Sequence, residues 1–340
     1  MEKFNWPIIG HEKIQQFLQK SLVNNRLAHA YIFSGPANLG KSLLAEKFID
    51  SILCSDYHKQ ISSEAKTLPC EGCVFCQQLN KGIHPDVFYL KKEDDKKNIS
   101  VEQVREMQKF LSLTSFLNSY KIAMIINAQE LSEAAQNALL KILEEPSSKT
   151  ILILLAEDYN FLLPTIVSRC QLVKFRPLNG DKIFHYLLSL GASREQAKIL
   201  NLLCCGRIGL ALELFQKPEL FNSYLEKMNQ ILNFFNQDLS TRFKNSASIF
   251  SDAKNAIEST ASLNKELDYW QLILRDMLLI KNNLGHMLVN YHFKETFEKI
   301  SAGYSNSNLL NLLKQVTKIK QYLNYNINPR LVVENLLIDL

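Results

Sequence analysis

Residues 35–42 match the G-x-x-x-x-G-K-S pattern of a phosphate-binding loop and read Gly35-Pro36-Ala37-Asn38-Leu39-Gly40-Lys41-Ser42. In such a loop the backbone N–H groups surround a polyphosphate, the lysine reaches the terminal phosphates and the hydroxyl binds Mg²⁺. The apolar run 30–34 before it is typical of a buried strand, and residues 41–49 after it carry apolar residues at helical spacing. The stretch therefore predicts a strand–loop–helix unit that can hold ATP or ADP with Mg²⁺.

The carboxylates that would let this loop hydrolyse ATP are missing downstream. A hydrolytic partner strand would end in Asp-Glu, in which Asp holds the Mg²⁺ water shell and Glu activates the attacking water. The best candidate strand, residues 122–126, is followed by Asn127, Ala128 and Gln129. An amide cannot accept a proton from water and binds a hard cation far more weakly. We therefore expect a chain that can bind a nucleotide but does not split it.

The overall composition is that of an ordinary soluble protein. The chain has 340 residues, of which 46% are hydrophobic and 21% charged, and its net charge of +5 permits a nucleic-acid partner without requiring one. No apolar run approaches the ~20 residues that span a bilayer, and residues 1–6 lack the features of a signal peptide. These observations predict a cytoplasmic protein with no membrane partner.

The order of segments predicts an α/β domain followed by helical domains. Up to Pro177, strand-like and helix-like segments alternate, which favours a parallel sheet flanked by helices. The expected strands after the loop are 86–90, 122–127, 151–155 and 172–175, and the expected helices are 100–116 and 132–145 with Ser132 as N-cap. Residues 178–214 are expected to form a small helical unit. From 215 to 340 the apolar residues recur at helical spacing, for example at Trp270, Ile273, Leu274, Met277 and Leu278.

An inserted segment at about 54–84 carries a cluster of cysteines. Cys70, Cys73 and Cys76 have the spacing Cys-x2-Cys-x2-Cys, and Cys54 lies fifteen intervening residues upstream. Four thiolates complete a closed structural zinc site without an open position for water, so the site would fix a loop and not catalyse. Two alternatives remain from the spacing: three surface thiols around a turn, or His58 as the fourth ligand.

Arg169 lies in the segment Ser168-Arg169-Cys170, just before an expected strand. From its position it is a surface residue, an ion-pair partner at the edge of the core, or a finger that reaches the nucleotide of a neighbouring subunit. Cys170 is better interpreted as a small buried hydrophobe than as a nucleophile. Upstream, Glu144 and Glu145 lie in the last turn of an expected helix, where the helix dipole disfavours acids, which hints at a functional or inter-subunit partner.

Five segments in order resemble the delta-prime subunits of the bacterial DNA polymerase III clamp loader, within the AAA+ family. The resemblance covers roughly residues 5–210 and rests on Ile8-Ile9-Gly10-His11-Glu12, on residues 25–31, on the cysteine cluster followed by His84-Pro85-Asp86, on residues 137–146 and on residues 163–171. It implies an AAA+ domain over 1–177 with a zinc module at about 54–84, a helical lid over 178–214 and a helical collar over 215–340 that makes the subunit contacts.

The same resemblance assigns roles. It implies that Ser168, Arg169 and Cys170 form the arginine-finger motif, with Arg169 acting on the ATP of a gamma/tau neighbour. The chain would then have no activity of its own but would belong to the DNA polymerase III holoenzyme and contribute to the clamp-loader ATPase in trans. The implied partners are delta and gamma/tau subunits in a hetero-pentamer and, through it, the sliding clamp and primer-template DNA.

This sequence departs from the family pattern in three places, and two rival interpretations remain. The phosphate loop is intact where many delta-prime loops are decayed, the gap between Cys54 and Cys70 is longer than usual, and Leu155-Ala156-Glu157 replaces a sensing threonine. One rival is an ATP-hydrolysing motor of gamma/tau type that uses Glu130 or Asp158 as its acid. The other is direct nucleic-acid binding by the zinc module through Lys59, Lys66 and Lys81.

Overall fold

The computed structural model describes residues 3–58, 67–93, 96–116, 119–147, 149–246, 256–322 and 329–340. The chain divides into two compact units, Met1–Ile183 with Gly206–Leu210 and Phe184–Cys205 with Ala211–Leu340. The predicted boundaries after residues 177 and 214 would divide the chain into three domains, whereas this division gives two units, so they stay a prediction. Among the described residues, no helix combines the length and the apolar character needed to cross a membrane.

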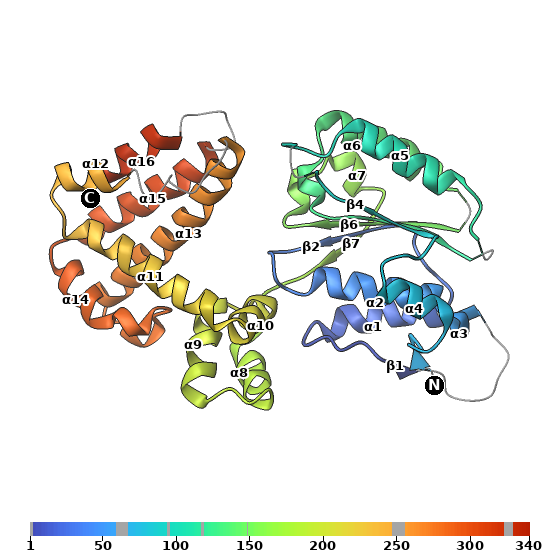
Figure 1. The fold of residues 1–340 in the computed structure, drawn as a ribbon, viewed down its shortest axis with the longest axis horizontal. Coiled ribbons are helices and arrows are strands. Elements are labelled where there is room, and N and C mark those ends of the chain that lie inside the picture. The colour runs from blue at the N-terminus through green and yellow to red at the C-terminus, as the bar shows by residue number, and fades with distance from the viewer. Residues whose placement is uncertain are drawn as a thin grey trace. The chain divides into compact units, whose positions relative to one another are not determined.

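The first unit is built on a five-stranded parallel sheet, as the segment order predicts (Figure 1). Its strands, in spatial order, are β4 (Val87–Leu90), β5 (Lys121–Ile125), β6 (Thr150–Ala156), β2 (Ala30–Ser34) and β7 (Gln171–Lys174). β2 pairs in parallel with β6 on one side and β7 on the other. Every residue of β2, β5 and β6 is buried, which explains why their sequences are apolar runs and not alternating patterns.

Helices cover both faces of this sheet (Figure 1). Tyr31 and Phe33 of β2 pack into one layer with residues of three helices, whereas Ala30 and Ile32 point to the opposite layer. The first layer contains α1 (Glu12–Val23), α2 (Lys41–Leu53) and α4 (Val74–Asn80), and the second contains α5 (Val101–Ser112), α6 (Glu133–Glu144) and α7 (Pro164–Val167). The predicted α/β architecture is therefore confirmed.

The helix ends follow the sequence signals with one exception. The Ser132 side chain caps α6 by accepting a hydrogen bond from the Ala135 N–H, as predicted. α5 ends at Ser112, whereas the apolar spacing predicted a helix to residue 116. The tertiary reason is Asp86, whose buried carboxylate accepts the Phe116 N–H at 3.0 Å and draws this segment out of helical geometry.

The insertion and the lid region add smaller elements to the first unit. The insertion contains α3 (Ser55–His58), α4 and β3 (Thr67–Leu68), which pairs in parallel with the N-terminal β1 (Lys3–Phe4). β7 leads to α8 (Gly180–Ser189), where the division into two units falls.

The second unit is helical over its described residues, as predicted. Trp270 is buried in its core and packs against Phe234 and Phe235 with ring centroids 6.0 and 5.5 Å away. The helices are α9 (Arg194–Cys204), α10 (Ile208–Gln216), α11 (Pro218–Phe235), α12 (Leu239–Ser246), α13 (Ala256–Lys281), α14 (Lys294–Ala302), α15 (Asn306–Tyr322) and α16 (Pro329–Ile338), with short 3₁₀ turns at Gly285–Met287 and Tyr291–Phe293.

We expect Gly35→Ala to destabilise the first unit by about 1–3 kcal/mol. Gly35 has φ +153°, and a Cβ atom there would lie 2.5 Å from the Phe175 carbonyl oxygen. Urea unfolding of the full chain measures the loss. Gly82→Ala is the matched control, because Gly82 also has a positive φ (+68°) but has open space around its Cβ position. An equal loss in both variants would attribute the effect to backbone strain and contradict the close approach to Phe175.

Candidate functional site

The phosphate loop joins β2 to α2 at the carboxyl edge of the sheet. The predicted strand–loop–helix unit is present, with β2 ending at Ser34 and α2 beginning at Lys41. Gly40, the N-cap of α2, has the left-handed conformation φ 85°, ψ 16°, which a residue with a side chain rarely adopts. The backbone N–H groups at the start of such a helix point out of the helix end, where they can donate hydrogen bonds to an anion.

Lys41 is held inside its own loop. Its ammonium donates hydrogen bonds to the carbonyl oxygens of Gly35 and Pro36, the latter at 2.7 Å. Burial lowers the pKa of Lys41, and the negative charge of Glu157 acts in the opposite direction. The partners of this ammonium are neutral carbonyls, so a phosphate would offer it a stronger, charged acceptor.

Two other segments of the same unit contact the loop. The Gly209 N–H donates to the Asn38 carbonyl at 2.8 Å, and a Cβ atom at position 209 would lie 2.9 Å from that oxygen. The His11 ring nitrogen Nε2 lies 3.1 Å from the Leu39 carbonyl oxygen. The sequence did not identify either contact, although the two glycines of Gly206-Arg207-Ile208-Gly209 are the signal that could have indicated a close backbone approach.

The carboxyl end of β5 has amides where a hydrolytic site has acids. Asn127 follows the strand in a left-handed conformation, and the Gln129 side chain accepts the Glu157 N–H at 3.2 Å. The two acids considered for a motor have partners of their own. Glu130 forms an ion pair with Lys92 at 3.3 Å, and Asp158 accepts the Asn160 N–H at 2.9 Å as the cap of a 3₁₀ turn.

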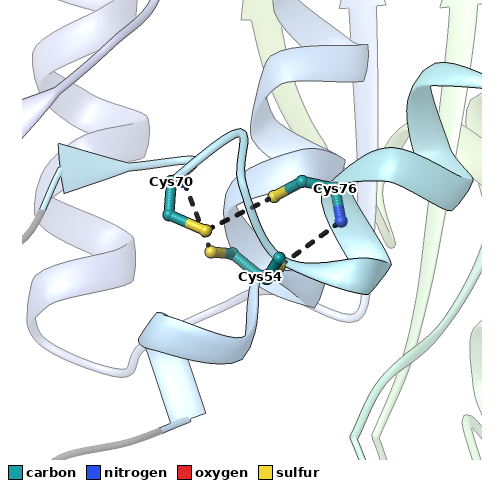
Figure 2. A group of neighbouring side chains, drawn as sticks. Cys54, Cys70 and Cys76 are labelled. Carbon is teal, nitrogen blue, oxygen red and sulfur yellow. Dashed lines mark hydrogen bonds between the residues drawn. The ribbon is translucent and has the colours of Figure 1, made fainter.

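The four predicted cysteine ligands come together in one cluster. Figure 2 shows three of them, Cys54, Cys70 and Cys76. Cys54 ends α2, Cys70 follows β3, Cys73 is the N-cap of α4 and Cys76 lies in its first turn. Their sulfur atoms all lie within 4.8 Å of one another. A tetrahedral zinc–thiolate site with Zn–S bonds of ~2.3 Å requires sulfur separations of ~3.8 Å, so the cluster needs only a small contraction to hold one metal ion.

The surroundings of the cluster also suit a metal–thiolate site. Backbone N–H groups point at two sulfur atoms, from Cys70 to Cys54 and from Cys76 to Cys73, each at 3.4 Å. Burial raises the pKa of Cys54 to about 11 and also raises that of Cys76. Burial likewise opposes ionisation of Cys73, but hydrogen bonds from Ser55 and Cys76 outweigh it and lower the pKa of Cys73 to about 6.

Three or four ionised thiols in this space repel one another unless a cation is present. The side chains of His58, Lys59 and Lys66 lie outside the described residues, whereas Lys81 is described and exposed. The alternative fourth ligand and the nucleic-acid interpretation of this module therefore stay untested.

Arg169 lies on the surface, at the end of the short helix α7. Its Nη2 forms an ion pair with Oε1 of Glu144 at 2.9 Å, and its Nη1 donates to the Thr165 carbonyl at 3.0 Å. The side chain is 37% exposed. Among the described residues, Arg169 bonds to no residue of the phosphate loop. The structure thus joins the four cysteines into one site but leaves Arg169 bonded to α6 and α7.

The segment that carries Arg169 is bonded to α6 through the Gln136 side chain. The Gln136 side chain accepts the Leu163 N–H at 2.8 Å and donates to the Phe161 carbonyl at 3.4 Å, and Ile166 is fully buried. Burial raises the pKa of the Cys170 thiol to about 12, which suits the prediction that it is not a nucleophile.

Comparison with known proteins supplies the family. The family model described as "DNA polymerase III, delta subunit" matches residues 10–179, and the model for "DNA polymerase III, delta subunit, C terminal" matches residues 226–340. Over 337 residues the chain is 27% identical to the Bacillus subtilis DNA polymerase III subunit delta′, covering 96% of this chain and 95% of that one. The chain belongs to the family of DNA polymerase III delta-prime subunits.

Further relatives agree with this assignment. The Haemophilus influenzae subunit delta′ is 32% identical over 234 residues, which are 68% of this chain and 66% of that one. The Bacillus subtilis subunit tau is 27% identical over 345 residues, covering 96% of this chain and 59% of tau. Among solved structures, Thermotoga maritima RuvB is 13% identical with a TM-score of 0.42 over 81% of this chain and 78% of that one, a similarity from which no function follows. The resemblance predicted for roughly residues 5–210 is thus confirmed, and the match to residues 226–340 extends it into the second unit.

Proposed function

We propose that this chain is a clamp-loader subunit that donates Arg169 to ATP bound by a neighbouring gamma/tau subunit while the sliding clamp is loaded onto primed DNA. The observation that carries the proposal is the position of the guanidinium. It lies at the surface, where the side chain is 37% exposed and bonds to Glu144 and to the Thr165 carbonyl. A cation that binds a phosphate on another subunit must be accessible at the surface of its own chain.

The chemistry of phosphoryl transfer explains what such a residue contributes. Negative charge spreads over the γ-phosphoryl oxygens in the transition state, and a guanidinium supplied from a neighbour stabilises it. The rate effect of such a finger is about 10³–10⁵-fold. A chain without a hydrolytic site can therefore control turnover at a site formed with its neighbour.

We further propose that the chain does not hydrolyse ATP itself. Three observations support this: Asn127 follows β5 in place of an acid, Gln129 bonds to the backbone of Glu157, and Glu130 and Asp158 already have partners. The phosphate loop retains its glycine-rich motif, with Gly40 as N-cap of α2, and its lysine, Lys41. We therefore propose that it holds ATP or ADP with Mg²⁺ as a structural ligand.

We propose zinc as the metal of the cysteine cluster. The ligand set of Cys54, Cys70, Cys73 and Cys76 favours zinc because four soft thiolates in a closed tetrahedron are its usual structural site. When bound, zinc would hold the thiols ionised and join α2, β3 and α4. The four cysteines fix the insertion to the end of α2, and β1 pairs with β3 beside them.

The partners follow from the same proposal. They are delta and gamma/tau subunits in a hetero-pentamer, with the helical second unit as collar, and the sliding clamp and primer-template DNA bound through the complex. Relatives named as delta′ and tau subunits over most of this chain support membership of such an assembly. We propose a cytoplasmic location on this basis.

We expect Arg169→Ala to lower the clamp-stimulated ATPase rate of the reconstituted complex by about 10³-fold if every turnover uses this finger, and less if other sites act without it. Subunit assembly, measured by size-exclusion chromatography, should not change. Arg194→Ala, which removes another exposed arginine on α9, is the control and should have no effect. An unchanged ATPase rate in Arg169→Ala would exclude the finger.

We expect the isolated chain to bind ATP or ADP in calorimetry and Lys41→Ala to abolish the binding, because the ammonium is the charged group of the loop. Phosphate release by the isolated wild-type chain should stay at background. Steady release that Lys41→Ala abolishes would instead support an ATP-hydrolysing motor.

We expect the purified chain to contain about one zinc ion per molecule. Cys70→Ala should lose the metal and destabilise the insertion, which atomic absorption and limited proteolysis measure. Cys205→Ser is the control, because Cys205 is an exposed cysteine outside the cluster. Full metal content in Cys70→Ala would contradict the four-thiolate site.

A further inference from the structure

We propose that Glu144 is a positioning residue for Arg169: its carboxylate holds the guanidinium at the surface in the orientation in which it meets a neighbour's triphosphate. This inference rests on the proposed role of Arg169 as an arginine finger. It assigns a function to a side chain that, among the described residues, bonds to neither the phosphate loop nor the cysteine cluster.

The contacts around Arg169 come from two elements and leave part of the guanidinium open. Glu144, the last residue of α6, accepts from Nη2 at 2.9 Å, and Thr165 of α7 accepts from Nη1 at 3.0 Å. The Ser168 hydroxyl lies 3.5 Å from Nη1. A guanidinium has five N–H donors in a rigid plane, so two fixed acceptors define the plane and leave other N–H groups for phosphate oxygens.

The acid lies where the helix itself does not favour one. The carbonyl groups at the end of α6 are the negative end of the helix dipole, which repels a carboxylate at Glu144. Arg169 pairs with this carboxylate and, with Lys141 in the last turn of α6, offsets the repulsion. A local choice that helix energetics oppose is typical of a functional requirement, because a neutral or basic residue would stabilise the helix end better.

Because the Arg169–Glu144 ion pair is exposed, it can position the arginine while contributing little to the stability of the fold. The side chains of Arg169 and Glu144 are 37% and 52% exposed. Ion pairs with this exposure contribute little to folding, because water screens the charges and two long side chains lose freedom when they pair. Removing the Glu144 carboxylate should therefore leave the fold intact and change chiefly the freedom of Arg169.

The backbone that carries Arg169 is fixed to α6, so the start of the arginine side chain is held in place as well as its guanidinium. α7 is fixed to α6 through Gln136, which bonds on both sides of the turn at Leu162, and Ile166 is fully buried. With the backbone fixed, the remaining freedom is in the arginine side chain. If the side chain is ordered before the partner arrives, the entropy cost of ordering it is no longer part of the activation free energy.

The test compares ATP turnover in the clamp loader reconstituted with gamma/tau, delta, clamp and primed DNA. We expect Glu144→Ala to lower kcat by about 2- to 10-fold with little change in the KM for ATP, because the freedom of one side chain is restored. Glu144→Gln keeps an acceptor oxygen without the charge and should fall between wild type and Glu144→Ala. The control, Glu145→Gln, removes the adjacent exposed acid and should match wild type.

The double variant separates this inference from the proposed function. Glu144→Ala should have no further effect in an Arg169→Ala background, since the carboxylate acts through the guanidinium. If Arg169→Ala lowers kcat and Glu144→Ala does not, or raises it, the positioning role is wrong and the finger remains. If Arg169→Ala has no effect, both are wrong. A Glu144→Ala effect of equal size in the Arg169→Ala background also overturns the positioning role.

A second measurement reads the position directly in the isolated chain. The ¹⁵N signal of the Arg169 guanidinium, assigned by its loss in Arg169→Lys, should have restricted rotation in wild type and in Glu145→Gln. Glu144→Ala should increase that rotation while the thermal unfolding midpoint stays within experimental error. Equal rotation in wild type and Glu144→Ala would overturn the proposal.

Discussion

Burial of strand β2 on both faces is the constraint on which the rest of the first unit depends. Its residues contact the α1–α2 layer and the α5–α6 layer alternately, and it pairs with β6 and β7 on its two edges. The phosphate loop leaves its carboxyl end, and α7 with Arg169 connects its two neighbouring strands. The strand thereby holds both functional segments of the unit on one frame.

The two sets of functional groups on this frame differ in their surroundings. Lys41 is buried and bonded to carbonyl groups of its own loop, so a nucleotide there would stabilise the chain that binds it. Arg169 is exposed and paired with an exposed acid, which is compatible with the proposed contact to a phosphate on a neighbouring subunit. Burial of one cation and exposure of the other is the physical basis on which we propose separate roles for them.

Much of this arrangement could be predicted because it depends on local pattern. The apolar runs predicted the strands, Ser132 predicted the start of α6, and the cysteine spacing predicted which thiols would meet. The end of α5 was predicted wrongly because a carboxylate distant in sequence, Asp86, binds the Phe116 N–H. Periodicity contains no information about such a contact.

The sequence by itself determined the phosphate loop, the missing acids, the cysteine ligands and the order of strands and helices, because each depends on residue type at short spacing. The tertiary structure decided that Glu144 pairs with Arg169 and that Gly209 bonds to Asn38. The first pair is separated by tens of residues and the second by more than a hundred, and only packing of the helices on the sheet brings the partners within hydrogen-bonding distance.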